Sequence, residues 1–342
     1  MLAAAALVGA VVVFTALREW LWYWMTVDYR DGAWAQPIVE NLQALSASGA
    51  SADLAIQAGA QGKLVWAALT LLVLIFIVVV AGVSAWICLM AFRRHRIWAA
   101  FGIAILIGLT LLPYYLFPSY EMVLCADTDG PGCSFALTAR DRFFFTPYSY
   151  VIFKQVYSAD LAAFYWRVMQ AEWALLNPVN LLALLAVIAL LAEGRDERVR
   201  RLAGQVAQYR VFLLVNSGLV TVLGLATPAE LGWLAEVVER VDPQSPVPFR
   251  ELQLGITLFL GITNSLFLAL LFVPLGGLLW LRARRFAREE NPEANVSDLE
   301  RWEKDKGVAI FAHGPLLQIG SIFAPLVIGG GVSLLRAAIF AG

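Results

Sequence analysis

Charged residues are scarce in this chain, and their scarcity excludes an ordinary soluble protein. Only 15% of the 342 residues are Asp, Glu, Lys or Arg, whereas soluble domains carry about 25%. Hydrophobic residues make up 60% of the chain, and the mean hydropathy is +0.72. The charged residues also gather between long apolar runs instead of spreading over surfaces. The composition therefore predicts an all-α, polytopic transmembrane helical bundle.

Histidine and cysteine are nearly absent, and this excludes several cofactor classes. The two histidines, His95 and His313, cannot supply a pair of intramembrane ligands, so bis-histidine haem and histidine-rich metal centres are excluded. The three cysteines have no metal-ligand spacing, so no metal and no cofactor is predicted. A quinone pocket stays open, because it needs only aromatic residues and one or two polar groups. No basic stripe interleaved with aromatics occurs, so nucleic acid is not a predicted partner.

Catalytic motifs are missing as well. The chain has no Gly-x-Ser-x-Gly, no His-Glu-x-x-His, no nucleotide-binding glycine loop and no intramembrane Asp pair, so no enzyme is predicted. The interiors of the clearest apolar runs contain no Asp, Glu, Lys or Arg. Since a buried charge in a membrane usually marks a functional site, this absence argues against a pump built on a buried carboxylate.

The apolar runs predict one integral membrane domain with about seven spans. These are residues 2–24, 64–92, 97–117, 174–191, 211–227, 252–281 and 308–340. Two more polar helices, 193–210 and 291–306, connect spans on the same side. The first is predicted to run directly into the fifth span. Ser297 and Glu300 have the spacing of a capping box at the start of the second.

Basic residues set the predicted orientation. Of the 25 Lys and Arg residues, 15 lie in the three short connections 93–96, 193–210 and 282–306. Cytoplasmic loops are enriched in Lys and Arg, so the N-terminus is predicted inside and the C-terminus outside. High Ala and Arg usage favours a bacterial inner membrane. The predicted partners are membrane lipids, together with further copies of this chain or other subunits of a membrane complex.

The same orientation places residues 119–173 outside as a cap between spans three and four. Cys125 and Cys133 would then lie in an oxidising compartment and form a structural disulfide across an Asp-Gly-Pro-Gly turn. A redox-active dithiol or a cation site at Asp127 and Asp129 fits the spacing less well. Eleven of the 31 residues from 143 to 173 are aromatic. They predict an interfacial anchor, with a docking surface or lid as the alternative.

Uncharged polar residues recur at helical spacing in the last three predicted spans. One interpretation is helix packing, because small residues let helices approach and polar residues bond across the interface. The other is an uncharged path through a channel or transporter, favoured by Pro315, Pro325 and the glycines at 329–331. The candidate path residues are Asn216, Thr221, Thr257, Asn264, His313, Gln318 and Ser321.

Two functions follow from these interpretations. The leading hypothesis is a non-enzymatic, channel- or transporter-like membrane protein. The alternative is a scaffold, anchoring or sensor subunit of a membrane protein complex. A water-filled groove between spans five to seven would favour transport, whereas a dry, packed interface there would favour a scaffold.

Overall fold

The computed structural model describes residues 60–92, 159–192, 199–241, 249–310 and 315–340, together with positions 13, 14, 17 and 40. These ranges form six helices and contain no strand, which confirms the all-helical prediction for the described part of the chain. The helices are α4 (Ala60–Phe92), α7 (Ala159–Ala192), α8 (Val199–Val241), α9 (Phe249–Glu290), α10 (Val296–Asp305) and α11 (Pro315–Phe340).

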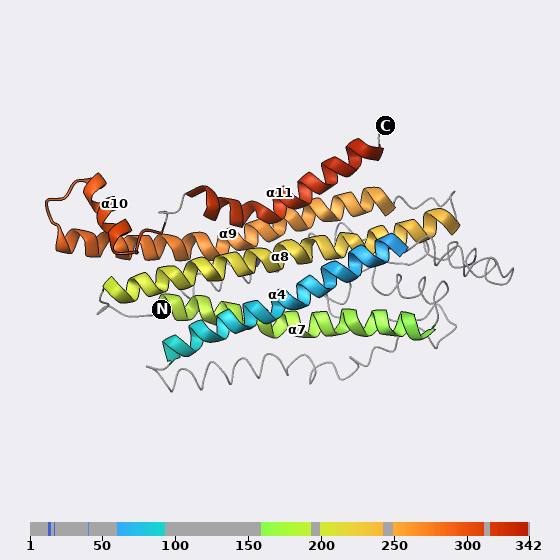
Figure 1. Cartoon of the computed structure of the whole chain (residues 1–342), viewed down its shortest axis with the longest axis horizontal. Helices are drawn as coiled ribbons and strands as arrows, with labels where there is room; N and C mark the ends of the chain where they lie inside the picture. The colour runs from blue at the N-terminus through green and yellow to red at the C-terminus, as the bar shows by residue number, and fades with distance from the viewer. Residues whose placement is uncertain are drawn as a thin grey trace.

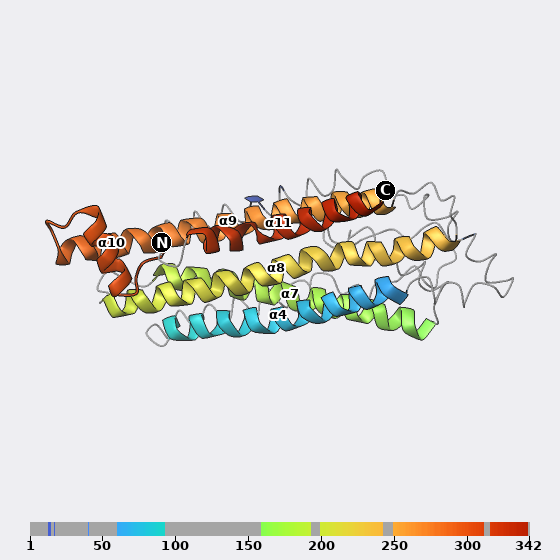
Figure 2. The ribbon, with the colours of Figure 1, turned by 45° about the horizontal axis from the view of Figure 1, so that its top comes forward.

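Five of the helices lie side by side in an elongated bundle, and the short α10 sits at one end (Figures 1 and 2). Helix α8 is central and packs against α4, α9 and α11, while α7 packs mainly against α4. Helices α4, α7 and α9 run in one direction, and α8 and α11 run in the other. We call the end at which α8 and α11 begin the basic end, because it carries Arg200, Arg201, Arg282, Arg284, Arg285 and Arg288. The opposite end is called the far end.

Within the described residues, three helices are long and apolar enough to cross a membrane. They are Gln61–Met90, Val199–Val237 and Gln253–Glu290. Helices α7 and α11 contain shorter apolar segments, Pro178–Leu190 and Gln318–Gly331. Large apolar side chains also face outward, as in α4, where Leu64 and Val78 are 71% and 70% exposed. An apolar surface of this kind is typical of a helix that faces lipid. The predicted spans 2–24 and 97–117 lie almost wholly outside the described residues.

The central helices are longer than the sequence pattern predicted. Helix α8 has 43 residues and α9 has 42. At about 1.5 Å per residue, each is roughly twice as long as a hydrocarbon core of about 30 Å is thick. The fifth predicted span ended before Pro228, but α8 continues through it to Val241. Gln253 of α9 donates its Nε2 hydrogen to the Pro228 carbonyl oxygen at 2.7 Å, so a neighbouring helix supports the backbone there.

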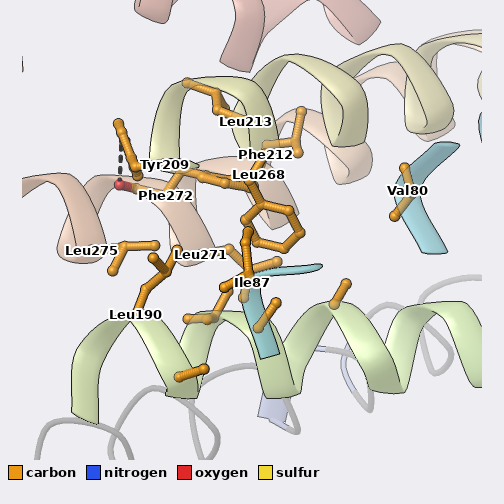
Figure 3. Close-up of a cluster of buried hydrophobic side chains, with 14 of the residues drawn as sticks. Val80, Ile87, Leu190, Tyr209, Phe212, Leu213, Leu268, Leu271, Phe272 and Leu275 are labelled. Carbon is orange, nitrogen blue, oxygen red and sulfur yellow. Dashed lines mark hydrogen bonds between the residues drawn. The ribbon is translucent and has the colours of Figure 1, made fainter. Parts of the chain in front are cut away.

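The hydrophobic core lies where α4, α7, α8 and α9 meet (Figure 3). Phe212 of α8 and Phe272 of α9 are fully buried, and their ring centroids are 5.3 Å apart. Tyr209 lies beside the same Phe272 and donates its hydroxyl hydrogen to the Phe272 carbonyl oxygen at 3.1 Å. Gly276 makes room for this contact, because a Cβ atom there would lie 2.7 Å from the tyrosine hydroxyl. Dense side-chain packing therefore fixes how α8 sits on α9.

Helix α10 begins differently from the sequence prediction. Asn295 is the N-cap, and its side-chain oxygen accepts a hydrogen bond from the Asp298 backbone N–H at 3.0 Å. The capping box predicted at Ser297 is therefore wrong, because Ser297 already lies inside the helix. An asparagine is as strong a cap as serine and stands two residues earlier. After α10, Gly307 adopts a φ of +69° and turns the chain into a buried segment, residues 308–310.

Candidate functional site

Five of the seven residues predicted to line a path are buried polar residues of α8, α9 and α11, three helices that pack against one another. Together with Ser217 and Ser265, we call this group the polar seam, and its members are all buried. They are Asn216, Ser217, Thr221, Thr257, Asn264, Ser265 and Ser321. The seam members that the sequence predicted as path residues are Asn216, Thr221, Thr257, Asn264 and Ser321. Their bonds decide whether the seam is a path or a packing interface.

Most of the seam's polar side chains bond to helix backbone. Asn216 and Thr257 donate to carbonyl oxygens one turn earlier in their own helices, at 2.8 and 2.6 Å. Asn264 of α9 donates its Nδ2 hydrogen to the Val220 carbonyl oxygen of α8 at 3.0 Å. Thr221 is the exception, since its buried hydroxyl oxygen has no hydrogen-bond partner. These bonds tie helices together and leave few polar groups for a passing solute.

The seam is built around a proline in α11. Pro325 has no N–H, so the carbonyl oxygen of Ser321, four residues earlier, cannot receive its usual helical bond. Ser217 of α8 donates its hydroxyl hydrogen to that oxygen at 2.5 Å. On the other side of the proline, the Leu326 N–H donates to the Ser265 hydroxyl oxygen of α9 at 3.2 Å. Two serines from neighbouring helices therefore support the backbone of α11 on either side of Pro325.

Small residues bring α9 and α11 into direct backbone contact. A Cβ atom at Gly261 would lie 3.0 Å from the Pro325 carbonyl oxygen. A Cβ atom at Gly329 would lie 3.3 Å from the Thr257 carbonyl oxygen. Glycines at such positions let two membrane helices pack closely, and van der Waals contact then supplies much of the association energy. The α9–α11 interface is therefore close-packed.

Gln318 is not part of the polar seam. Gln318 donates its Nε2 hydrogen to the carbonyl oxygen of Ile310, in the buried segment that precedes α11. Arg210 of α8 donates a guanidinium hydrogen to the carbonyl oxygen of the preceding residue, Ala309, at 2.5 Å. The two side chains thus satisfy backbone groups of a non-helical segment, which must bond to protein when it is buried. His313 lies outside the described residues.

Helix α10 is held against α9 at the basic end by a buried ion pair. Arg284 Nε lies 2.8 Å from Glu303 Oε1, but the N–H does not point along that line, so the contact is electrostatic without a hydrogen bond. Arg284 also bonds to Glu300 at 3.3 Å, and Trp302 Nε1 donates to Glu290 at 3.0 Å. Burial raises the pKa of the Glu303 carboxyl above its ordinary value, while Arg284 acts in the opposite direction and Glu300 adds to the rise.

A cavity of about 630 Å³ lies beside α10, away from the seam. It is open and lined by residues of both signs, among them Glu290, Asp298, Arg301 and Trp302. Because Trp302 already bonds to Glu290, part of this wall is committed to holding α10 in place. Among the residues that the structure describes, no group of three or more His, Cys, Asp or Glu side chains could hold a metal ion.

The far end contains buried carboxylates that the sequence pattern missed. Glu172 of α7 and Glu230 of α8 are each only 3% exposed. Glu236 of α8 accepts a hydrogen bond from the Gly62 N–H of α4 at 3.1 Å. The predicted spans began at residue 174 and ended at 227, so Glu172 and Glu230 were assigned to connections. The signal was present in the apolar residues of 229–237, which continue the helix beyond Pro228.

The cysteines divide between the described and the remaining residues. Cys88 is buried in α4, as expected for a small apolar residue inside a span. Cys125 and Cys133 lie outside the described residues, so their disulfide stays a prediction. No protein-family model, no curated protein and no solved structure matches this chain. Its function must therefore be argued from the bundle itself.

Proposed function

We propose that this chain is a non-enzymatic integral membrane protein that serves as a scaffold, anchoring or sensor subunit of a membrane complex. The observation that supports the proposal is that polar side chains of the seam form hydrogen bonds between helices. Ser217, Ser265 and Asn264 bond to backbone atoms of neighbouring helices, and glycines close the α9–α11 interface. Such a seam holds helices in fixed positions, which is what a scaffold requires.

The topology that accompanies this proposal has seven spans, with the N-terminus cytoplasmic and the C-terminus outside. The basic end would face the cytoplasm of a bacterium, and residues 119–173 would form an outer cap pinned by Cys125 and Cys133. The basic residues at one end of the bundle support this orientation, because positively charged segments are retained inside. Membrane lipids and other protein chains are the proposed partners.

A channel or transporter is the second candidate, and one observation favours it. Helix α11 contains Pro325 inside the seam, which removes one of its backbone hydrogen bonds, and the buried Thr221 hydroxyl oxygen of the seam has no partner. Interrupted helices with unsatisfied oxygens form substrate and ion sites in several transporter folds. Under this hypothesis, α11 would bend at Pro325 to open the seam, and the two serines would release its backbone.

One pair of measurements separates the two functions. The full chain is first extracted from native membranes in mild detergent after brief chemical cross-linking. A scaffold is expected to run as a discrete complex larger than the 37.5 kDa chain. A monodisperse monomer without a co-purifying chain would contradict that function.

The second measurement is solute and ion flux into liposomes that contain the purified chain. The scaffold proposal predicts no flux above that of empty liposomes. The variants Asn264→Leu and Gln318→Leu serve as probes if flux is found. Flux that falls in Asn264→Leu, at a seam bond, but persists in Gln318→Leu, outside the seam, would support transport through the seam.

A further inference from the structure

A buried carboxyl group on α7 is not part of the polar seam. Glu172 is 3% exposed, and its Oε1 atom has no hydrogen-bond partner. It lies six residues before the apolar segment Pro178–Leu190, toward the far end of the bundle. A second buried carboxylate, Glu230, comes from α8 and is close enough for its charge to act on Glu172. A carboxyl group as deeply buried as that of Glu172 needs a compensating positive charge or a proton.

Among the residues that the structure describes, no Lys or Arg side chain offsets the charge of the Glu172 carboxyl, on which the like charge of Glu230 acts. The Trp66–Trp233 ring contact, with centroids 5.4 Å apart, sets the register of the antiparallel helices α4 and α8. One turn further along, this register brings Thr70 level with Glu230, and the buried Thr70 hydroxyl oxygen also has no partner. The charged residues on the described helices at this end are Lys63 on α4, Asp160 and Arg167 on α7, Glu230, Glu236, Glu239 and Arg240 on α8, and Arg250 and Glu251 on α9.

The electrostatics of Glu172 follow from this setting. Burial, and after it the like charge of Glu230, raises the pKa of the Glu172 carboxyl to about 8. A carboxyl group in such a place is mostly neutral at physiological pH. It can then donate a hydrogen bond as well as accept one. The alternative, a bare carboxylate, would leave an uncompensated charge in a nearly closed space.

We propose that Glu172 is a proton-binding site whose occupancy controls how the outer part of α7 packs in the bundle. With the proton bound, the neutral side chain stays buried. When the proton leaves to the far-end solution, the carboxylate is left without compensation, and the segment before Pro178 moves until the oxygens reach water. Pro178 gives α7 a natural place to bend, because it removes one helical bond. This inference rests on the fold and does not depend on the proposed scaffold function.

The direction of the effect is fixed by linkage. The folded-state pKa is raised, so the stabilisation of α7 packing is fully present at low pH and is lost as the pH rises through about 8. Alkaline conditions on the far-end side therefore loosen α7. Glu230 takes part through its charge, so replacing it should shift the transition to lower pH without abolishing it.

The test is an infrared titration of the full chain in lipid nanodiscs. At neutral pH the wild type should show the C=O band of a protonated carboxylic acid, which disappears with a midpoint near pH 8. Glu172→Gln should lose this band, Glu230→Gln should keep it with a lower midpoint, and the exposed control Glu289→Gln should match the wild type. Hydrogen exchange in residues 159–177 should rise above the midpoint in the wild type and not in Glu172→Gln.

Two outcomes would overturn the proposal. The first is the absence of the band from the wild type at neutral pH, because Glu172 would then be ionised. A band that survives in Glu172→Gln counts equally against the proposal, because it would belong to another carboxyl group. The second is a band that sodium removes at fixed pH while choline does not, because the site would then bind a metal cation. The wild-type titration and Glu230→Gln decide the matter even where Glu172→Gln fails to fold. Failure of this proposal leaves the cross-linking and flux results of the scaffold proposal untouched.

Discussion

Replacing Gly261 by alanine tests whether α9 and α11 touch backbone to backbone. The added Cβ atom would lie 3.0 Å from the Pro325 carbonyl oxygen and 3.2 Å from the Leu326 Cα atom. Both are backbone atoms of a second helix, so no side-chain rotation can relieve the contact. Helix α11 must shift by a few tenths of an ångström against the serine bonds that hold it. Overpacking of this kind costs about 1–3 kcal/mol.

Gly255 supplies a matched control on the same helix. A Cβ atom at Gly255 would meet no atom within 4 Å. Alanine is favoured over glycine inside a helix by roughly 1 kcal/mol, and this gain applies at both positions. It therefore cancels when the two variants are compared. Gly261→Ala should be less stable than Gly255→Ala by about 1–3 kcal/mol, a factor of roughly 5–150 in the unfolding equilibrium.

The assay is unfolding in mixed micelles. SDS is titrated into the protein in mild detergent, and the loss of tertiary structure is followed by tryptophan fluorescence and near-ultraviolet circular dichroism. The pair Gly261→Leu and Gly255→Leu should enlarge the difference, because a leucine at 261 needs far more space. Equal midpoints for Gly261→Ala and Gly255→Ala would refute the close α9–α11 contact. The seam would then be loose enough for the transport hypothesis.

Three further predictions concern the other helix contacts. Gly276→Ala should displace the Tyr209 hydroxyl and lower the free energy of unfolding by about 1–3 kcal/mol. The adjacent Gly277→Ala should not, because a Cβ atom there meets open space, and the SDS unfolding midpoints of the two variants test the difference. Arg284→Met should leave the Glu303 carboxylate buried without compensation, which lowers the stability of the fold by about 3–5 kcal/mol. Hydrogen exchange in residues 296–310 should rise in this variant, and the double variant Arg284→Met/Glu303→Leu should restore most of the protection. Because the folded-state pKa of Glu303 is raised, the docking of α10 on α9 should be more stable in acid and weaken as the pH rises through that pKa. Hydrogen-exchange rates of α10, corrected for their intrinsic pH dependence, should show this trend in the wild type and not in Glu303→Gln.

The sequence by itself determined the class of this protein. Long uncharged runs between clustered charges are typical of helices that could cross a membrane, because a helix bonds its backbone groups within its own segment. The same reasoning located the end of α4 at Phe92, where an apolar run meets Arg93. It also selected most of the seam, since Asn216, Thr257 and Asn264 are unusual inside otherwise apolar helices.

The tertiary structure decided what those residues do. Nothing in the local pattern says that Ser217 bonds to the Ser321 carbonyl oxygen, which Pro325 leaves free, because Ser217 and Ser321 are 104 positions apart in the chain. Periodicity ended the fifth span at Pro228, yet Gln253 of another helix supports the backbone there and α8 continues. Burial of Glu172 and Glu230 likewise depends on which helices surround them. Local sequence fixes the helices, whereas contacts between distant helices decide which polar groups are satisfied and which remain available for function.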